Sequence, residues 1–250
     1  MTDPVRPAAT VLLLRDQPAF EVLMVKRHHQ IDFAAGALVF PGGKTHAGDH
    51  DPAWADHALG WESVGEDGAP LRIAAIREAY EEAGVLLARD ADGRTYAGEA
   101  AIDVRAAVAD DRTAFLDVVR ALGLKLDLAA LTIFARWITP PLTAKRFDTW
   151  FYVAHAPLAQ LAVCDGREAV DAEWIAPGQA LDLAASGLRK VIFPTRMNLQ
   201  LLAESPNAAA AIETARTRPL VTVEPWVDGT SLRIQPEAGY GVVVEPLSGL

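Results

Sequence analysis

Residues 70–85, PLRIAAIREAYEEAGV, form the strongest helix pattern in the chain. Pro70 suits the first turn of a helix, and Gly84 stands where helices usually end. At about 100° per residue, one face of this helix is apolar and the opposite face is acidic. The apolar face carries Ile73, Ile76, Tyr80 and Ala83, and the acidic face carries Glu78, Glu81 and Glu82. The segment therefore predicts a helix that packs on one side and presents three carboxylates on the other.

These three carboxylates have two interpretations. They could form an ordinary solvated face, although like charges three or four residues apart destabilise a helix by roughly 0.2–0.5 kcal/mol per pair. No lysine lies on this helix, and Arg77 precedes Glu81 in the less favourable order for an ion pair. A divalent cation such as Mg²⁺ would make the cluster favourable, because it takes oxygen ligands from carboxylates and phosphates together. The helix alone leaves both interpretations open.

A glycine-rich turn, FPGGKTHAGD at residues 40–49, follows a predicted strand. Its Gly-Lys-Thr resembles an ATP-binding P-loop, but such a loop needs a glycine five positions before Gly43, where Leu38 stands. A P-loop is therefore not expected. If the turn packs beside the acidic helix face, Gly43 can offer a backbone carbonyl to a metal ion, and backbone N–H groups can face a phosphate.

The composition restricts the classes of ligand and compartment. A chain of 250 residues, 51% of them hydrophobic, is long enough for a sizeable core. A net charge of −10 argues against nucleic-acid binding, so an anionic ligand needs a bound cation or a local cluster of Arg and Lys. Cys164 is the only cysteine, and neither a signal peptide nor a membrane span is expected. We therefore expect a cytoplasmic protein that does not contact membranes.

The rest of the chain predicts an α+β fold with mixed strands. Strands are expected at 9–14, 20–26, 37–40, 131–140, 146–156 and 172–177. A helix is expected over 104–124, with Phe115, Val118, Val119 and Leu122 on one face. A helical region over 178–204 is broken near Phe193-Pro194, and the tail from 220 to 245 has strand character, with a hairpin turn at Asp228-Gly229.

The helix predicted over residues 70–85 resembles the helix of the Nudix box, the sequence motif of the Nudix hydrolase superfamily. We call it the box helix. Residues 77–85, REAYEEAGV, contain every fixed position of the second half of its sequence box. The first half begins at Gly43, and Asp49 stands where the family has glutamate. The spacing from Gly43 to Arg77 is 34 residues (77 − 43 = 34), which is about 20 more than usual. An insertion of about residues 50–69 therefore splits the box within a loop, where extra residues are tolerated.

The sequence on either side of the box also resembles one branch of the superfamily. GALVFPGG at 36–43 and RWITP…RFDTWFYVA after the box are similar to the peroxisomal-type coenzyme A diphosphatases and their bacterial relatives. The signature of that branch has an arginine where Asp32 stands, and Arg27 is the alternative anion-binding candidate. The resemblance implies a Nudix-like α/β/α sandwich with a mixed central sheet over residues 1–205. Residues 206–250 then form a β-rich C-terminal extension of unassigned role.

The resemblance also implies an activity and its residues. It implies hydrolysis of a diphosphate bond in a nucleoside diphosphate linked to another group, with Mg²⁺ or Mn²⁺ as cofactor. Coenzyme A or acyl-coenzyme A would give adenosine 3′,5′-bisphosphate and (acyl-)4′-phosphopantetheine. The implied metal ligands are Glu78, Glu81, Glu82 and the Gly43 carbonyl. Glu78 is also a candidate base, Arg77 would orient the glutamates, and the candidates for substrate binding are Arg27, Gly42, Lys44 and Arg146.

Several alternatives stay open at this point. The substrate could be ADP-ribose, a dinucleoside polyphosphate or a nucleotide sugar, or the chain could bind a nucleotide without cleaving it. A small-molecule nucleotide diphosphate is the expected partner, and a homodimer is left open. Trp54 and Trp61 of the insertion are expected to pack against the domain rather than to stack on a base. Three acids are expected to be solvated surface residues rather than further metal ligands: Glu168, Asp171 and Glu173.

Overall fold

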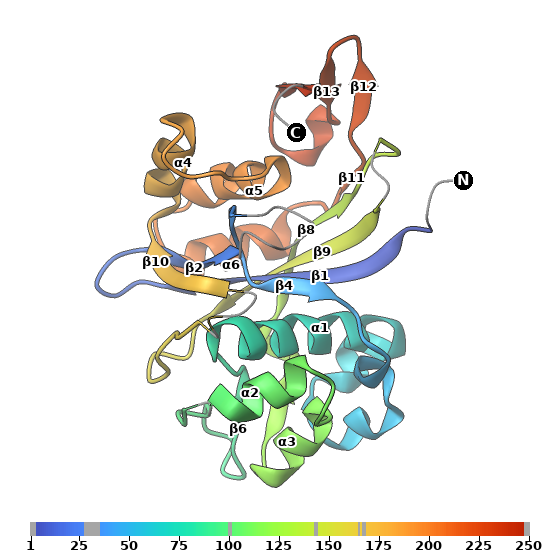
Figure 1. Ribbon diagram of the computed structural model, residues 1–250, viewed down its shortest axis with the longest axis vertical. Coiled ribbons are helices and arrows are strands. Elements are labelled where there is room, and N and C mark those ends of the chain that lie inside the picture. The colour runs from blue at the N-terminus through green and yellow to red at the C-terminus, as the bar shows by residue number, and fades with distance from the viewer. Residues whose placement is uncertain are drawn as a thin grey trace.

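The computed structural model describes residues 4–27, 36–99, 102–142, 145–164, 166 and 169–247. A central eight-stranded sheet lies between two helical layers, and a small separate sheet lies near the C-terminus (Figure 1). The expected Nudix-like α/β/α sandwich with a mixed sheet and an additional C-terminal sheet is therefore confirmed.

The central sheet combines parallel and antiparallel pairs. Its strands are β1 Arg6–Arg15, β2 Glu21–Arg27, β3 Leu38–Val39, β4 Gly42–Lys44, β8 Thr132–Ile138, β9 Phe147–His155, β10 Ala169–Ile175 and β11 Thr222–Val223. Their order is β10-β2-β1-β9-β8-β11, while β3 pairs with β2 and β4 pairs with β1. The pairs β1–β9 and β8–β11 are parallel, and the other pairs in this sheet are antiparallel.

Strand β1 shows why this sheet needs a helical layer on each face. Val11 and Leu13 point into the core below the sheet, and Leu12 and Leu14 point into the core above it. All four side chains have no exposed surface. A strand that is apolar on both faces is stable only when both faces are covered.

The lower layer contains the box helix and the insertion. Its helices are α1 Trp61–Ala83, α2 Ile102–Ala109 and α3 Phe115–Ala121, and its small sheet contains β5 Ala58–Leu59, β6 Ala88–Arg89 and β7 Lys125–Asp127. Short 3₁₀ helices span Ala47–His50, Pro52–Asp56 and Leu128–Ala130. Figure 1 shows α1 directly beneath β4 and β1, with α2 and α3 farther from the sheet.

Two helix predictions in this layer need correction. The box helix begins at Trp61 rather than at Pro70, with a kink at Gly65 (φ 71°, ψ 165°). Pro70 follows the kink by five positions, near the start of the second helical segment. The helix predicted over 104–124 is in fact α2 and α3, separated by a turn in which Asp111 has φ 56°. Leu122 lies past the end of α3 and is exposed.

The upper layer contains α4 Pro177–Ala185, α5 Phe193–Ala203 and α6 Ala208–Thr217. The predicted break before Phe193 is confirmed. Helix α6 was not expected, although its alanine-rich sequence favours a helix and Asn207 caps it by accepting a hydrogen bond from the Ala210 N–H (2.8 Å). The remaining tail forms the sheet β12 Trp226–Asp228, β13 Ser231–Arg233 and β14 Val244–Pro246, with a 3₁₀ helix over Pro236–Ala238. The hairpin turn at Asp228-Gly229 is confirmed.

The C-terminal residues are attached to the sandwich by partly buried polar contacts. The Tyr240 hydroxyl donates to Asn198 Oδ1 (2.7 Å) and accepts from the Trp137 indole N–H (3.1 Å). Arg196 of α5 pairs with Glu245 of β14 at 2.5 Å. The division at residue 205 remains a prediction. Within the residues that the structure describes, no helix combines the length and apolar character needed to cross a membrane.

Candidate active site

The glycine turn and the acidic helix face meet in the folded protein. Gly43 in β4 lies so close to α1 that a Cβ atom built on it would be 2.5 Å from Cδ of Glu78. A Cβ on Gly42 would instead be 2.7 Å from the Ala9 carbonyl oxygen. Each position thus needs glycine for a different reason. Gly43 leaves room for a carboxylate, and Gly42 leaves room for the neighbouring strand β1.

Glu82 is the most buried of the three helix glutamates. Its side chain is 4% exposed, and it accepts a hydrogen bond from the backbone N–H of Gly42 (3.1 Å). Arg27, at the end of β2, has its Nη1 atom 3.9 Å from Glu82 Oε1. The structure thus brings the predicted anion-binding groups Arg27 and Gly42 to the same carboxylate.

Arg77 is the centre of the cluster. Its Nη1 donates to Glu78 (2.9 Å) and to Glu81 (3.0 Å), while Nε and Nη2 donate to the two oxygens of Asp49 (2.9 and 3.1 Å). Nη2 also donates to the Lys44 carbonyl oxygen (2.9 Å). A planar guanidinium suits this fork geometry, which a lysine cannot reproduce. The side chain therefore joins the helix glutamates to the turn.

Asp49 connects the first half of the box to Arg77 in the second half. It is 1% exposed and, besides its two bonds to Arg77, accepts from the backbone N–H of His46 (2.7 Å). Sequence reasoning treated Asp49 only as a departure from the family pattern, yet the shorter side chain reaches Arg77 across 28 residues of chain. The two halves of the box are thus contiguous in space, although the insertion separates them in sequence.

Burial and mutual repulsion perturb the charges here. Burial, followed by the charge of Glu78, raises the pKa of Glu81 to about 7. Burial alone would lower the pKa of Arg77, but Glu78 and Asp49 outweigh it and raise this pKa above its ordinary value. Arg77 therefore stays charged. Asp49, Glu78 and Glu81 share the positive charge of its guanidinium.

The donor set suits a hard divalent cation in its chemical type. Carboxylate oxygens and a backbone carbonyl are the ligands that Mg²⁺ and Mn²⁺ take, and Gly43 leaves a cradle that any Cβ would fill. Among the described residues, however, no three acidic, histidine or cysteine side chains converge as a group that could hold a metal ion. In the structure Glu78 and Glu81 turn toward Arg77 instead. Binding a cation would require these side chains to reorient.

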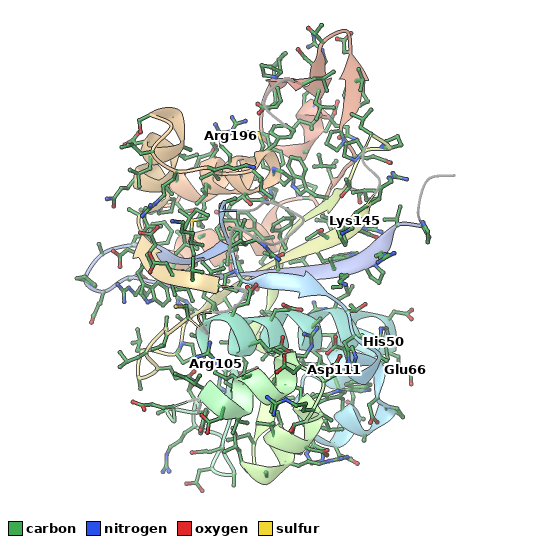
Figure 2. The ribbon with its side chains drawn as sticks, in the orientation of Figure 1. His50, Glu66, Arg105, Asp111, Lys145 and Arg196 are labelled. Carbon is green, nitrogen blue, oxygen red and sulfur yellow. The ribbon has the colours of Figure 1, made fainter. Side chains whose placement is uncertain are left out.

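Arg105 was missed by the sequence analysis. It is 1% exposed and donates from Nη2 to the Glu81 carbonyl oxygen (2.8 Å), where it also meets the negative end of the helix dipole. A Cβ on Gly84 would lie 3.0 Å from Nη1 of Arg105. Figure 2 shows Arg105 below the C-terminal half of α1, with Glu66 at the other end of that helix. The available signal was an arginine inside an otherwise apolar helix pattern.

The side-chain contacts described for the other candidates are with groups other than the helix glutamates. The Lys44 side chain is exposed, and Arg146 donates to the Thr139 carbonyl (2.9 Å) and to Glu224 (2.9 Å) in the C-terminal region. Their roles in substrate binding remain predictions. Of the three acids near β10, Asp171 is exposed and Glu173 pairs with Arg189 (3.7 Å). The predictions that involve Asp32 and Glu168 lie outside the described residues.

The insertion packs as expected. Trp54 is 1% exposed, its indole N–H donates to the Gly48 carbonyl oxygen (2.9 Å), and its ring lies 5.7 Å from that of Phe115. Trp61 is partly buried against the same core. The interpretation of both tryptophans as packing residues is confirmed.

Comparison with known proteins identifies the family. Residues 56–194, more than half of the chain, match the family described as the NUDT19 Nudix domain. The chain belongs to this Nudix family. The crystal structure of a NUDIX hydrolase from Alicyclobacillus acidocaldarius is 31% identical, with a TM-score of 0.75, and the match covers 86% of this chain and 97% of that one. The Nudix fold assignment thus agrees with the sheet and helix arrangement described above.

Curated relatives carry a more specific name. The acyl-coenzyme A diphosphatase NUDT19 of Homo sapiens is 28% identical over 222 residues, covering 71% of this chain and 59% of the relative. Its counterpart from Xenopus laevis is 23% identical over 206 residues, covering 65% of this chain and 54% of the relative. The chain thus spans between half and three fifths of the length of these two Nudix relatives.

Proposed function

We propose that the chain is a metal-dependent Nudix diphosphohydrolase that cleaves coenzyme A or acyl-coenzyme A. The products would be adenosine 3′,5′-bisphosphate and (acyl-)4′-phosphopantetheine. The observation that carries the proposal is the buried cluster in which Arg77 joins Asp49 to Glu78 and Glu81, directly beside Gly43. The names of the curated relatives support the substrate.

Glu78, Glu81, Glu82 and the Gly43 carbonyl would hold the divalent ion, with Mg²⁺ or Mn²⁺ as the candidates. When bound, such an ion neutralises diphosphate charge and lowers the pKa of a coordinated water. Arg77 keeps the glutamates near the turn by holding Asp49 and the Lys44 carbonyl at the same time. A helix glutamate, with Glu78 as the first candidate, would take the proton from the attacking water.

Arg27 would bind the substrate diphosphate. Its guanidinium lies at the end of β2 beside Glu82, and the ion pair between them is long (3.9 Å), so a bound diphosphate could offer it a closer partner. The Gly42 backbone and the Lys44 side chain are secondary candidates on the adjacent turn. Arg146 is the weakest of the four, because its guanidinium is engaged by Thr139 and Glu224.

The decisive experiment is a product analysis of the full chain. Coenzyme A, acetyl-coenzyme A, ADP-ribose, a dinucleoside polyphosphate and a nucleotide sugar are each incubated with Mg²⁺ or Mn²⁺, and products are identified by mass spectrometry. We expect adenosine 3′,5′-bisphosphate from the coenzyme A species, and no product in the presence of EDTA. Cleavage of the other nucleotides without any turnover of coenzyme A species would reject the substrate. A chain that binds nucleotides without cleaving any would reject the activity.

A matched pair of substitutions on α1 tests the metal role. Glu82→Gln should lower kcat at least ~100-fold, because it removes a charged ligand while keeping the shape of the side chain. Glu66→Gln is the control, since it makes the same change at an exposed position on the same helix. Equal rates for the two variants would show that Glu82 holds no metal that the reaction needs.

A further inference from the structure

A second positively charged site lies at the open edge of the central sheet. A pocket of about 340 Å³ is lined by residues of α1, of β8 and its preceding turn, and of the segment that ends α6 and follows it: Arg72, Leu131, Thr132, Ile133, Phe134, Ala215, Arg216, Arg218 and Leu220. Strand β11 pairs with β8 only at Arg136 and Trp137, among the described residues. Within the part of the chain that the structure describes, the first half of β8 therefore has no strand paired at this edge, and α6 packs against β8.

Three arginines face this pocket from two helical layers. Arg72 comes from α1, stacks over the Tyr152 ring at 5.0 Å, and makes one long hydrogen bond from Nη1 to the Gly68 carbonyl (3.3 Å). Its Nε is buried and has no hydrogen-bond partner among the described residues. A buried guanidinium donor without an acceptor is unusual, because such groups are normally paired. Arg72 thus makes fewer described hydrogen bonds than its guanidinium group can donate.

The other two arginines come from the upper layer. Arg216, at the end of α6, forms an exposed i,i+3 pair with Glu213, and exposed pairs of this kind are weak. Arg218 donates to the Phe134 carbonyl and lies over the Phe134 ring at 5.1 Å, which fixes its guanidinium at the pocket wall. No aspartate or glutamate is among the residues that line the pocket. In a chain of net charge −10, this is a local concentration of positive charge.

The pocket is separate from the Nudix carboxylates. Arg72 and Glu81 are nine residues apart on α1, which at about 100° per residue places them on opposite sides of the helix. The box cluster lies under β4, whereas this pocket lies at β8, on the other side of β1 and β9 in the sheet order. Neither Glu78, Glu81 nor Glu82 lines it.

We propose that this pocket is a metal-independent binding site for the phosphate group of a small organic anion, such as a nucleotide. Guanidinium groups bind phosphate oxygens through charge-assisted, forked hydrogen bonds, and the only hydrogen bond described for Arg72 is the long one from Nη1 to the Gly68 carbonyl (3.3 Å). The remaining wall is largely apolar, through Leu131, Ile133 and Leu220, and would cover an organic body. A volume of this size is typical of small-ligand sites.

The test is calorimetric titration of the full chain in EDTA, so that no divalent ion can support binding at the box. The probes are inorganic phosphate, adenosine 5′-monophosphate, adenosine and octanoate. We expect both phosphate probes to bind, the nucleotide more tightly than phosphate, and binding to weaken as salt rises. We expect adenosine and octanoate not to bind. Absence of binding by both phosphate probes, or equal binding of octanoate, would overturn the proposal.

Substitutions assign the binding to this pocket. Arg72→Gln and Arg216→Gln should each weaken nucleotide binding about tenfold, since each removes a charged hydrogen-bond donor. Arg94→Gln is the control for Arg216→Gln, because Arg94 is also an exposed arginine in a surface ion pair. Glu82→Gln should leave binding unchanged. Unchanged affinity in Arg216→Gln, or loss of binding in Glu82→Gln, would refute the site. Arg216 is exposed, so this result stands even if Arg72→Gln unfolds the protein.

Discussion

Arg77 illustrates how one side chain can organise a site through its shape as well as its charge. Its guanidinium makes hydrogen bonds to three carboxylates and one carbonyl, from both the helix and the turn. A lysine at this position would keep the charge but could not satisfy these acceptors simultaneously. The charge alone is therefore not sufficient for the arrangement that we propose to be catalytic.

Substitution of Arg77 by lysine should consequently separate the two contributions. We expect Arg77→Lys to lower kcat/KM about 100-fold, in the range found when groups that orient metal ligands are removed. Steady-state kinetics with coenzyme A measures the effect, and Arg94→Lys, on an exposed loop, is the matched control. Full activity of Arg77→Lys would mean that the fork to Asp49 and Lys44 does not position the glutamates.

The paired glycines make a second prediction at the level of single residues. In Gly43→Ala the new methyl group would displace the flexible Glu78 carboxylate, so we expect activity to fall at least ~10-fold with little loss of stability. In Gly42→Ala the methyl group would meet the backbone of β1, so we expect a lower melting temperature. Thermal unfolding and kinetics of both variants test this. Gly178→Ala, where nothing lies within 4 Å, is the control.

The insertion packs against the box helix and so stabilises it. It separates the two halves of the box only in sequence. Trp54 packs on Phe115 of α3, and Phe115 in turn lies 5.5 Å from Tyr80 of α1. The extra residues thus form a layer beneath the helix. This explains how a chain with a split box can still bring Asp49 to Arg77.

Removing this contact should destabilise the whole lower layer. We expect Trp54→Ala to lower the free energy of unfolding by about 3–5 kcal/mol, because it leaves a large cavity and removes the indole hydrogen bond to the Gly48 carbonyl. Trp226→Ala, at a residue that is 44% exposed, should cost less than about 1 kcal/mol. Urea unfolding of both variants measures the difference. Similar values for the two would mean that the insertion is only loosely attached.

At the scale of the whole molecule, the C-terminal region contributes to the sandwich itself. Helix α6 buries Ala208, Ala211, Ile212 and Ala215 in the upper core, and β11 extends the central sheet beside β8. A chain without this region would expose apolar surface above the sheet. Helix α6 and strand β11 are therefore packed into the sandwich itself.

Deletion of residues 206–250 tests the boundary at 205 directly. We expect the shortened chain to lose cooperative unfolding or to aggregate, because α6 no longer covers β8 and β9. Circular dichroism during heating and size-exclusion chromatography would report this. A monomeric truncated chain with an unchanged melting temperature would instead establish residues 1–205 as an independent domain.

Local spacing along the chain was enough to predict the helix face with Glu78, Glu81 and Glu82, the end of the helix at Gly84, and most strands of the central sheet. These features depend on backbone geometry, which repeats every few residues and can be read in a single segment. The prediction was wrong for the start of α1 and for the 104–124 helix, where a glycine kink and a tertiary turn interrupt a continuous pattern.

Long-range contacts were decided only by the tertiary structure. Asp49 reaches Arg77 across the insertion, Arg105 ends buried against the Glu81 carbonyl, and Arg72 joins Arg216 around one pocket. Each meeting depends on how whole layers pack on the sheet, and that packing is the sum of many small contact energies spread over distant segments. No local pattern encodes such a sum, so the sequence did not show which distant groups Arg72, Arg77 and Arg105 would contact.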